Sequence, residues 1–406
     1  MPDFDALSGD GPLAGVVVIE AGTMISSGSL GRLLSDFGAT VIKVEHPEYD
    51  DPLRDLQPRK DGIGLWWKYL SRNKKTITLN LSDDRGKAVF EDLASEADVV
   101  IENFRPGTFD RWGIGYDDLS DVNEDLVMLS ISGYGQSGPY SEKPGFGTLA
   151  ESLSGFAHLN GFPDSPPLLP KTGFADNIAA LYSAFAIMYA LYNRDVNGGS
   201  GQHIDVSLLE PLFNILGPEP LQYDQLDEIP MRSGNQSSIS APRNVYRTGD
   251  ERYIALSAST QNVAMRCFEA IDRSDLKEDP RFSDNERRVD NADELDEIIQ
   301  DWIGEHSRED VVEHFEEYDV PVAPVYNIKD IMDDEHFQAR EAIIGVDDED
   351  LGGEARVQNV FPKFGDTPGD VEYLGPAKGE YNEAVYGDIL GYDEQFRAEL
   401  ESDGII

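Results

Sequence analysis

Basic residues are scarce in this chain of 406 residues. It has 33 lysines and arginines against 78 aspartates and glutamates, which gives a formal net charge of −45 at pH 7. A protein with this charge repels phosphate backbones and anionic lipid surfaces, so nucleic-acid and membrane-surface binding are excluded as main functions. Because 40% of the residues are hydrophobic, the chain can still bury a large core and is not a disordered acidic tail.

Cysteine is almost absent as well. The single thiol, Cys267, cannot form an intramolecular disulfide, which suits a reducing cytosol. Its place in the helical pattern NVAMRCFEAI favours a small buried side chain. The six histidines are scattered and show no HExxH spacing, so no metal site is predicted.

Long hydrophobic runs are also missing. The N-terminal MPDFDALSGD has neither a basic nor an apolar segment, so no secretory signal is expected. The longest apolar run, 178–192, is shorter than the ~20 residues of a membrane span. It is flanked by Asp176 and Asn193, which favours a buried core helix. These features together predict a cytoplasmic protein.

The acidic residues are spread along the whole chain, as in DLSDVNEDL at 118–126 and DDEDLGGE at 347–354. Dispersed carboxylates suit a cytoplasm that contains molar salt, where the Debye length falls to about 3 Å and self-repulsion is screened. The composition therefore predicts a halophilic source, with ordinary acidity as the alternative.

The first half of the chain alternates apolar and helical segments. Strands are predicted at 15–22, 39–45, 75–82, 97–104 and 125–132, with helices at 27–37 and 86–95. Continuous apolar strands joined by helices are typical of a parallel sheet covered on both faces. The predicted fold class is α/β, with an open, doubly wound, Rossmann-like sheet that binds ligands at the carboxyl ends of its strands.

The second half is less regular. A strand leading into a helix is predicted at 203–217, a hairpin at 244–259, and acidic helices from 261 to 318. The proline-punctuated segment 320–327 is interpreted as a crossing back to the first domain.

Two segments at predicted strand ends suggest ligand binding. GYGQSG at 133–138 matches GxGxxG, but Pro139 follows at once and no long helix opens there, so a tight turn is favoured. In IENFRPGTFDRW at 101–112, arginines stand beside aromatic residues, which favours an anionic ligand; Phe104 would flank an adenine and Asn103 would hydrogen-bond it. A structural loop is the alternative, and the pair Lys74 and Lys75 has the same ambiguity.

Asp176 begins the apolar helix around 176–193. One interpretation is a helix N-cap, in which the carboxylate accepts backbone N–H bonds and stabilises the helix by about 1 kcal/mol. The other is a carboxylate nucleophile beside an apolar wall. The bare pattern favours the cap.

A run of motifs spans essentially the whole chain. It includes GATVIKVEHP, NKKTITLNL, ADVVIENFRPGTFDRWGIGYDDL, GYGQSGPYSEKPGF, GSGQHIDVSLLE and FPKFGDTPG. In this order they resemble the class III CoA-transferase family, also called the CaiB/BaiF family. The resemblance implies a large α/β domain from residues 1–220 and 325–406, a smaller α+β domain at 221–324, and an interlocked homodimer.

The resemblance also implies a mechanism. Asp176 matches the family's aspartate nucleophile, which attacks an acyl-CoA thioester, passes through a mixed anhydride and becomes an aspartyl-CoA thioester. Coenzyme A thioesters are then substrates, and no permanently bound cofactor is expected. Positions that match CoA-binding residues of the family are Ile19, Glu20, Ala21, His46, Leu79, Asn103, Phe104, Arg105, Arg111, Phe146 and Gly147. Glu20 departs from the pattern, because an acid beside an anionic cofactor is unfavourable unless it points away.

Two other functions stay open. Racemases of the family carry a G-H-D motif where this chain has Gly145, Phe146 and Gly147, so an α-methylacyl-CoA racemase would lack one of its two bases. A non-catalytic CoA-binding homologue is the other alternative. The family's glycine-rich lid corresponds here to GNQSSISAP at 234–242.

Within the family, the chain resembles haloarchaeal transferases of the methylaspartate cycle. This implies succinyl-CoA as the donor and mesaconate as the acceptor, with carnitine, oxalate, malate or an aromatic acid as alternative acceptors. A second carboxylate on the acceptor needs a cation, for which Arg243 and Lys171 are candidates.

Overall fold

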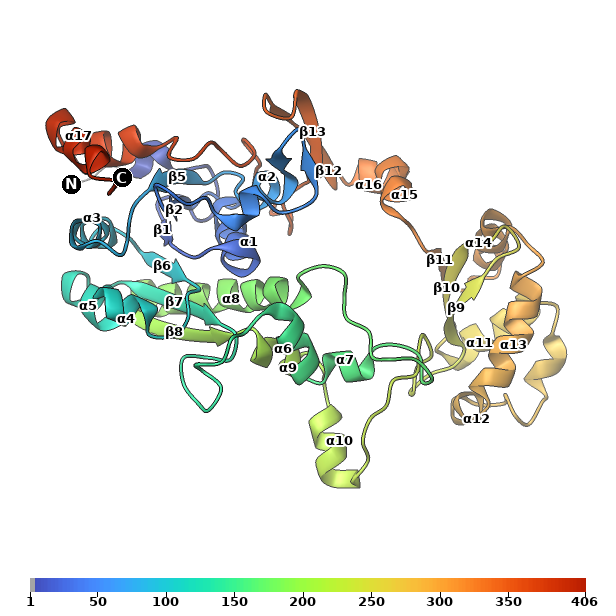
Figure 1. The fold of residues 1–406 in the computed structure, drawn as a ribbon. Helices are drawn as coiled ribbons and strands as arrows, with labels where there is room; N and C mark the ends of the chain where they lie inside the picture. Colours follow the sequence, from blue (N-terminus) through green and yellow to red (C-terminus); the bar gives the residue numbers. More distant parts are fainter. Residues whose placement is uncertain (1–3) are drawn as a thin grey trace. The chain divides into compact units, whose positions relative to one another are not determined.

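The computed structural model describes residues 4–406, which form two compact units (Figure 1). The first unit contains residues up to 156, 170–217 and 337–406, and the second contains 157–169 and 218–336. The predicted domain boundaries at 220/221 and 324/325 stay a prediction. Residues 1–3, which the predicted large domain includes, lie outside the described residues.

The first unit is built on a six-stranded parallel sheet in the order β5-β2-β1-β6-β7-β8. Its strands are β1 (Val17–Glu20), β2 (Thr40–Glu45), β5 (Lys75–Thr78), β6 (Val99–Glu102), β7 (Val127–Ser132) and β8 (Gln202–Ser207). The predicted α/β class with a parallel central sheet is confirmed. Each expected strand is present, although most are shorter than their apolar segments.

Both faces of this sheet are covered, which explains its continuous apolar strands. Val18 of β1 packs on one side among α1 (Met24–Ser35), α6 (Gly147–Leu153), α8 (Phe174–Asn197) and α9 (Leu209–Asn214). Ile19 packs on the other side among α3 (Asp84–Ala94), α5 (Tyr116–Val122), η4 (Glu383–Ile389) and α17 (Glu394–Ser402). Alternate residues of one strand thus serve two cores.

Smaller elements complete the first unit. They are η1 (Phe4–Leu7), η2 (Pro52–Arg54), β3 (Arg59–Lys60), β4 (Ile63–Gly64), α2 (Leu65–Leu70), α4 (Thr108–Trp112), β12 (Ile343–Asp348) and β13 (Gly353–Gln358). The last two form an antiparallel hairpin.

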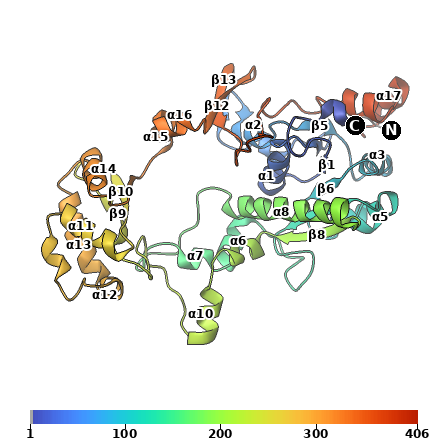
Figure 2. The same ribbon diagram turned by 180° about the vertical axis from the view of Figure 1, so that it is seen from behind.

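Helix α8 is only half buried, so its prediction as a core helix was wrong in part. It lies beside α1 and along β8 (Figure 2), and Ala179, Ala180 and Ile187 are buried there. Its other face exposes Phe185 and Tyr189. Among the described helices, α8 is the one long and apolar enough to cross a membrane, a test that core helices of soluble proteins also pass.

The second unit combines a three-stranded antiparallel sheet with helices. Its elements are α7 (Phe156–Leu159, which begins in the first unit), α10 (Glu219–Leu226), β9 (Arg243–Arg247), β10 (Tyr253–Ser257), α11 (Gln261–Ala270), η3 (Ser274–Lys277), α12 (Asn285–Asp290), α13 (Ala292–Ile303), α14 (Arg308–Glu317), β11 (Val322–Pro324), α15 (Ile328–Asp333) and α16 (Glu335–Ala339, which ends in the first unit). The hairpin is present as β9 and β10. Segment 320–327 is not simply a crossing, because β11 pairs with β10. Cys267 is buried in α11, as predicted.

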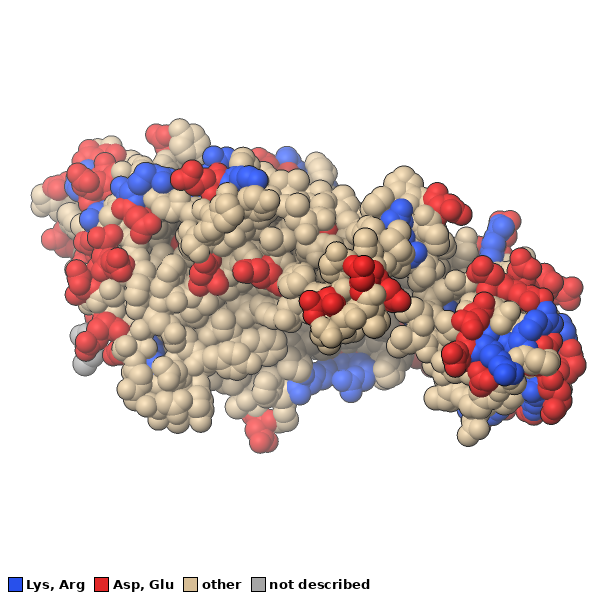
Figure 3. Space-filling view, turned by 90° about the horizontal axis from the view of Figure 1, so that it is seen from below, with Lys and Arg blue, Asp and Glu red and all other residues tan. Residues whose placement is uncertain are grey.

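The surface carries acidic side chains in many separate groups, shown in red on the face drawn in Figure 3. Most of their ion pairs are exposed, such as Arg85–Asp403 at 2.6 Å. Exposed pairs of this kind contribute at most about 1 kcal/mol each. Ion pairs on the surface therefore contribute little to the stability of the fold.

Candidate active site

The order of strands in the parallel sheet reverses at β1. Strands β2 and β5 lie on one side of β1, while β6, β7 and β8 lie on the other. In open α/β sheets, ligands bind in the crevice at the carboxyl ends of the strands at such a switch point. Two cavities of the first unit lie there, and both are lined by Thr23, which follows β1, and Phe104, which follows β6.

The first, the apolar cavity, has mainly hydrophobic walls. Its lining residues are Ala21, Thr23, Val44, Glu45, His46, Tyr49, Asp50, Asp51, Leu79, Asn80, Leu81, Ser82, Phe104 and Trp112. Phe104 packs against Trp112 with ring centroids 5.2 Å apart, which fixes both rings. Flat apolar walls at strand ends suit a planar ring such as adenine.

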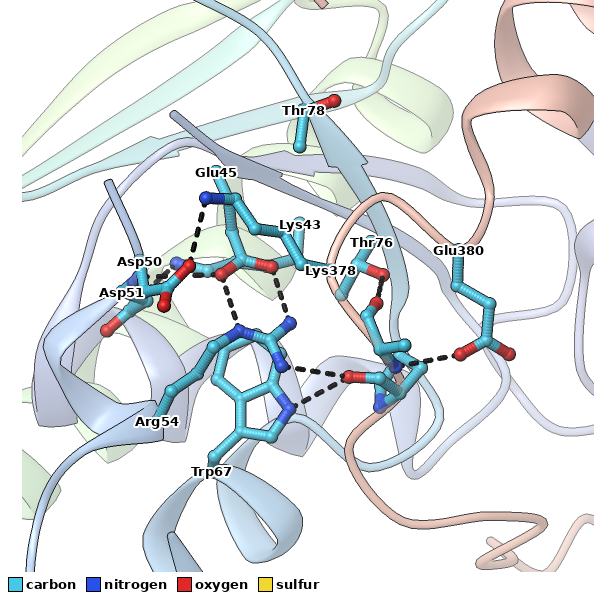
Figure 4. Close-up of polar contacts among 12 residues, drawn as sticks. Lys43, Glu45, Asp50, Asp51, Arg54, Trp67, Thr76, Thr78, Lys378 and Glu380 are labelled. Carbon is cyan, nitrogen blue, oxygen red and sulfur yellow. Dashed lines mark hydrogen bonds and ion pairs between the residues drawn. The ribbon is translucent and has the colours of Figure 1, made fainter. Parts of the chain in front are cut away.

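A buried polar network supports this cavity (Figure 4). Two guanidinium nitrogens of Arg54 bind the Glu45 carboxylate at 2.7 and 2.8 Å. The Arg54 guanidinium also lies 3.6 Å from the Trp67 ring centroid. Lys43 pairs with Asp51 at 2.8 Å. The network therefore holds segment 45–54, which lines the cavity, against β2.

The cations Lys74 and Lys75 belong to the interior and not to a ligand site. Lys74 is fully buried and binds Glu20 at 2.6 Å. Lys75 donates to the Tyr373 hydroxyl at 2.6 Å, and burial lowers its pKa. Glu20 points inward, which resolves its mismatch with an anionic ligand. The interpretation of these lysines as a ligand site was therefore wrong.

The second cavity, called the carboxylate cavity, contains Asp176. Its lining residues are Thr23, Met24, Ile25, Ser26, Asn103, Phe104, Arg105, Pro106, Ile131, Ser132, Gly133, Ser141, Lys143, Pro144, Gly145, Phe146, Gly147, Asp176 and Leu208. Asp176 stands in the first turn of α8, and Gly173 is the N-cap. The N-cap interpretation of Asp176 was therefore wrong, because the residue lies three positions inside the helix.

The surroundings of Asp176 make its carboxylate unusually basic. Burial, and then the negative charge of Glu151, raise its pKa to about 6, while a hydrogen bond from the Ser26 hydroxyl acts in the opposite direction. A carboxylate with a raised pKa that opens onto a cavity is a candidate acid, base or nucleophile. Ordinary helix-capping carboxylates have lowered pKa values, since they accept several N–H bonds.

Two glycines give Asp176 its space. A Cβ atom added at Gly147 would lie 2.7 Å from Asp176 Oδ2, and one added at Gly173 would lie 3.3 Å from it. Gly147 is the first residue of α6. Apart from Asp176, the nearest atom to a Cβ added there would be the Ala175 Cβ, at 3.5 Å. The carboxylate therefore rests directly against the backbone of α6.

Gly147→Ala is expected to displace this carboxylate. The new methyl group would push Asp176 Oδ2 aside, and a misplacement of about 1 Å costs on the order of 10²-fold in kcat/KM. The temperature of thermal unfolding should change little, because alanine is favourable in the first turn of a helix. Steady-state kinetics with thermal unfolding checks this, and Gly365→Ala, where an added Cβ meets no atom within 4 Å, is the control. Activity of G147A within twofold of wild type would contradict the expectation.

Asn103 has a positioning role that differs from the predicted one. Its Oδ1 accepts from Thr23 N at 2.8 Å, and its Nδ2 donates to Thr23 O at 2.7 Å and to Ser26 Oγ at 3.1 Å. Because both ends of the amide are occupied, the side chain is not free to bind an adenine. It clamps the loop after β1, which brings Ser26 to Asp176.

The structure brings most of the predicted site residues together. Ala21, His46, Leu79 and Phe104 line the apolar cavity, and Asn103, Phe104, Arg105, Phe146, Gly147 and Asp176 line the carboxylate cavity. Three predicted residues line neither. Ile19 and Glu20 have no exposed surface, and Arg111 is turned to Thr108 Oγ1 at 2.8 Å.

Three residues of the site escaped the sequence analysis. Ser26 and Glu151 act on Asp176, and Lys143 lines its cavity. Ser26 lies between ordinary helix residues and gives no signal. Glu151 stands four residues after Gly147, a spacing that places both on one helix face, and Lys143 precedes the segment PGFG. Their roles depend on tertiary packing.

The remaining sequence motifs and metal-ligating residues form no further site in the described part of the chain. GYGQSG forms a turn after β7, with positive φ at Gly135 and Gly138 and no helix behind it. Throughout residues 4–406, no group of three metal-ligating side chains is present. No described histidine lines the carboxylate cavity, and Phe146 does line it.

Comparison with known proteins now identifies the family. Residues 13–382 match the model of CoA-transferase family III. The chain belongs to this family. It is therefore an enzyme that transfers CoA, and CoA thioesters are its substrates.

The enzyme is similar along its whole length to characterised transferases. It is 38% identical over 396 residues to the succinyl-CoA–D-citramalate CoA-transferase of Chloroflexus aurantiacus, covering 97% of this chain and 98% of that one. It is 37% identical over 398 residues, with the same shares covered, to the beta subunit of that organism's succinyl-CoA–L-malate CoA-transferase. A formyl-CoA:oxalate CoA-transferase of Streptomyces avermitilis is 31% identical over 413 residues, covering 97% of this chain and 99% of that one.

Solved structures agree with this assignment of the transferase. A CaiB/BaiF family protein from Brucella suis superposes with a TM-score of 0.83 at 29% identity, covering 94% of this chain and 100% of that one. The chain therefore shares its overall fold with a solved member of the CaiB/BaiF family.

Proposed function

We propose that this enzyme transfers CoA from succinyl-CoA to mesaconate, with Asp176 as the nucleophile. The observation that carries the proposal is the half-buried carboxylate of Asp176, with a raised pKa of about 6, in a cavity at the switch point of the sheet. The relatives named for succinyl-CoA support the donor.

The reaction proceeds by two exchanges. Asp176 attacks the thioester carbonyl of succinyl-CoA, the C–S bond breaks, and CoA thiolate leaves an aspartyl–succinyl anhydride. The thiolate then attacks the carbonyl of Asp176, the C–O bond breaks, and succinate departs from an aspartyl-CoA thioester. Mesaconate attacks this thioester, and the same steps in reverse give mesaconyl-CoA and free Asp176. No proton is gained or lost overall.

The CoA ester extends through both cavities. The adenine lies in the apolar cavity against Phe104 and Leu79, with Ala21 and His46 beside it, and the thioester reaches Asp176 in the carboxylate cavity. Gly147 leaves room for the acyl carbon near Asp176, and Phe146 and Arg105 border that space. Ile19, Glu20 and Asn103 contribute by fixing the loop after β1. Holding both reactants replaces a slow encounter between two anions.

The second carboxylate of the acceptor meets cations of the carboxylate cavity. Arg105 and Lys143 line it, and neither forms an ion pair with an acidic residue in the described part of the chain. In a protein with a net charge of −45, two such cations in one cavity favour a dianionic substrate. The candidates from sequence fit less well, because Lys171 lines neither cavity and Arg243 belongs to the second unit.

Lys143→Met should raise the KM for mesaconate about tenfold, since a charge-assisted hydrogen bond is worth about 1.5 kcal/mol or more. The KM for a monocarboxylate acceptor, and kcat with saturating mesaconate, should stay unchanged. Lys171→Met is the matched control and should leave both KM values unchanged. Equal effects of K143M on the two acceptors would assign Lys143 to CoA instead.

The substrates are tested by incubating the protein in molar KCl with succinyl-CoA and a panel of free carboxylates, followed by chromatography of the CoA esters. Mesaconyl-CoA formed with stoichiometric loss of succinyl-CoA, and without free CoA, is the expected result. Transfer to citramalate, malate or oxalate alone would replace the acceptor. Absence of any ester exchange would overturn the donor.

The proposed assembly is an interlocked homodimer in a halophilic cytoplasm. On α8, Tyr182, Phe185, Tyr189, Tyr192 and Val196 are exposed at spacings of three and four residues. Such a continuous apolar stripe requires cover. Light scattering in molar KCl should give a dimer mass, and Phe185→Glu with Tyr189→Glu should yield monomers. A wild-type monomer would contradict the proposal.

A further inference from the structure

Glu151 is a buried acid without a counter-ion. Its side chain on α6 is 3% exposed, and no lysine, arginine or histidine forms an ion pair with it among residues 4–406. Its carboxylate accepts a hydrogen bond from the Ala175 N–H, at 3.3 Å. Buried carboxylates are rare unless paired, because removing the charge from water is costly. The presence of this one beside Asp176 requires an explanation.

Part of the explanation is helix capping. The N-cap of α8, Gly173, has no side chain to accept the free N–H groups of the first turn. Glu151 accepts one of them, from Ala175, and so fixes the turn that carries Asp176. A neutral acceptor such as glutamine could do the same, so capping does not account for the charge.

We propose that Glu151 is a positioning residue whose negative charge destabilises the free Asp176 carboxylate relative to its acylated forms. This inference rests on the proposed function. Asp176 is anionic at rest but neutral in the anhydride and in the thioester, so the repulsion disappears as soon as the covalent bond forms. The charge thus favours both covalent intermediates and makes Asp176 a stronger nucleophile.

Other groups around Asp176 act in the opposite direction. Ser26 on α1 donates a hydrogen bond to its carboxylate. Arg105, after β6, and Lys143, before α6, are the charged side chains that line the cavity with it, and both stabilise an anion. Asn177, the next residue of α8, is turned to Ser29. Without Glu151, the hydroxyl of Ser26 and the cations Arg105 and Lys143 would all stabilise the free carboxylate.

Glu151→Gln removes the negative charge but keeps the helix cap, because the amide oxygen can still accept a hydrogen bond from the Ala175 N–H. Asp176 must be ionised to attack, so kcat/KM rises with pH through its pKa of about 6. Removing the neighbouring charge lowers this pKa and moves the acid limb of the profile down by roughly one pH unit. Above the limb, the thioester that accumulates with succinyl-CoA should fall several-fold, as measured by mass spectrometry of the quenched enzyme.

Glu151→Asp is the second variant. It keeps the charge, so its acid limb should stay close to that of wild type even if thermal stability falls. An unmoved limb and an unchanged thioester fraction in E151Q would overturn the inference and leave Glu151 as a cap only. If the acid limb of the kcat/KM profile of E151D moved down in pH as far as expected for E151Q, the inference would also be contradicted. Transfer retained by Asp176→Asn would instead overturn the proposed function.

Discussion

Replacing Asp176 with Asn is expected to lower kcat by on the order of 10⁴-fold or more, since the loss of a covalent nucleophile leaves only binding and orientation. The asparagine keeps the size of the side chain and can still accept from Ser26, so the fold and the affinity for CoA esters should remain. Initial rates of succinyl-CoA consumption with an acceptor measure the loss, and equilibrium binding of CoA measures the retained affinity.

A matched control for this substitution is Asp205→Asn. Asp205 also stands at the carboxyl edge of the sheet, on β8, but it accepts from Gln136 N at 2.9 Å and lines neither cavity. Its replacement should change kcat less than threefold. If D176N retained a tenth of the wild-type rate, Asp176 would not be the nucleophile.

The second large effect concerns stability. Lys74→Met is expected to lower the free energy of unfolding by about 3 kcal/mol, because Glu20 would lose the partner that neutralises it in the interior. Both side chains are fully buried, and Lys74 Nζ lies 2.6 Å from Glu20 Oε2. Glu20 would then compete with Asp51 for Lys43, from which it is 3.4 Å away. Urea unfolding at fixed KCl measures the change.

Arg85→Ala provides the comparison for this variant. The Arg85–Asp403 pair is just as short, 2.6 Å, but both side chains are about half exposed. Its loss should cost less than about 1 kcal/mol. A double-mutant cycle with Glu20→Gln should also show strong coupling to Lys74, since neutralising both partners removes the uncompensated charge. Equal costs for K74M and R85A would contradict the assignment of Glu20 to the interior.

The sheet could be predicted because each strand carries its own signal. VVVI at 16–19 is a continuous apolar run followed closely by Gly22, and such runs occur when helices cover both faces. The burial of helix α8 was harder to predict, because apolar residues lie on all sides of it. The pattern cannot tell a fully buried helix from a helix with one exposed apolar face, and Phe185 and Tyr189 of α8 are exposed.

Asp176 was predicted as a nucleophile only through the family resemblance, because the bare pattern favours a helix cap. Phe104 was predicted from its own chemistry, as an aromatic residue at a strand end, and it lines both cavities. Glu20 and Asn103 were both predicted to contact CoA, but the sequence does not show where a side chain points. Glu20 turns to Lys74, and Asn103 turns to Thr23. The environment of Asp176 could not be predicted, because Glu151 and Ser26 come from two other helices.

The central claim is that CoA becomes covalently attached to Asp176 during transfer. The most direct test incubates the wild-type enzyme with succinyl-CoA and no acceptor, quenches it in acid, and maps the mass of CoA onto a proteolytic peptide. We expect the adduct on the peptide that contains Asp176, its removal by hydroxylamine or mesaconate, and its absence in D176N. An adduct on another residue, or none while transfer proceeds, would contradict the account.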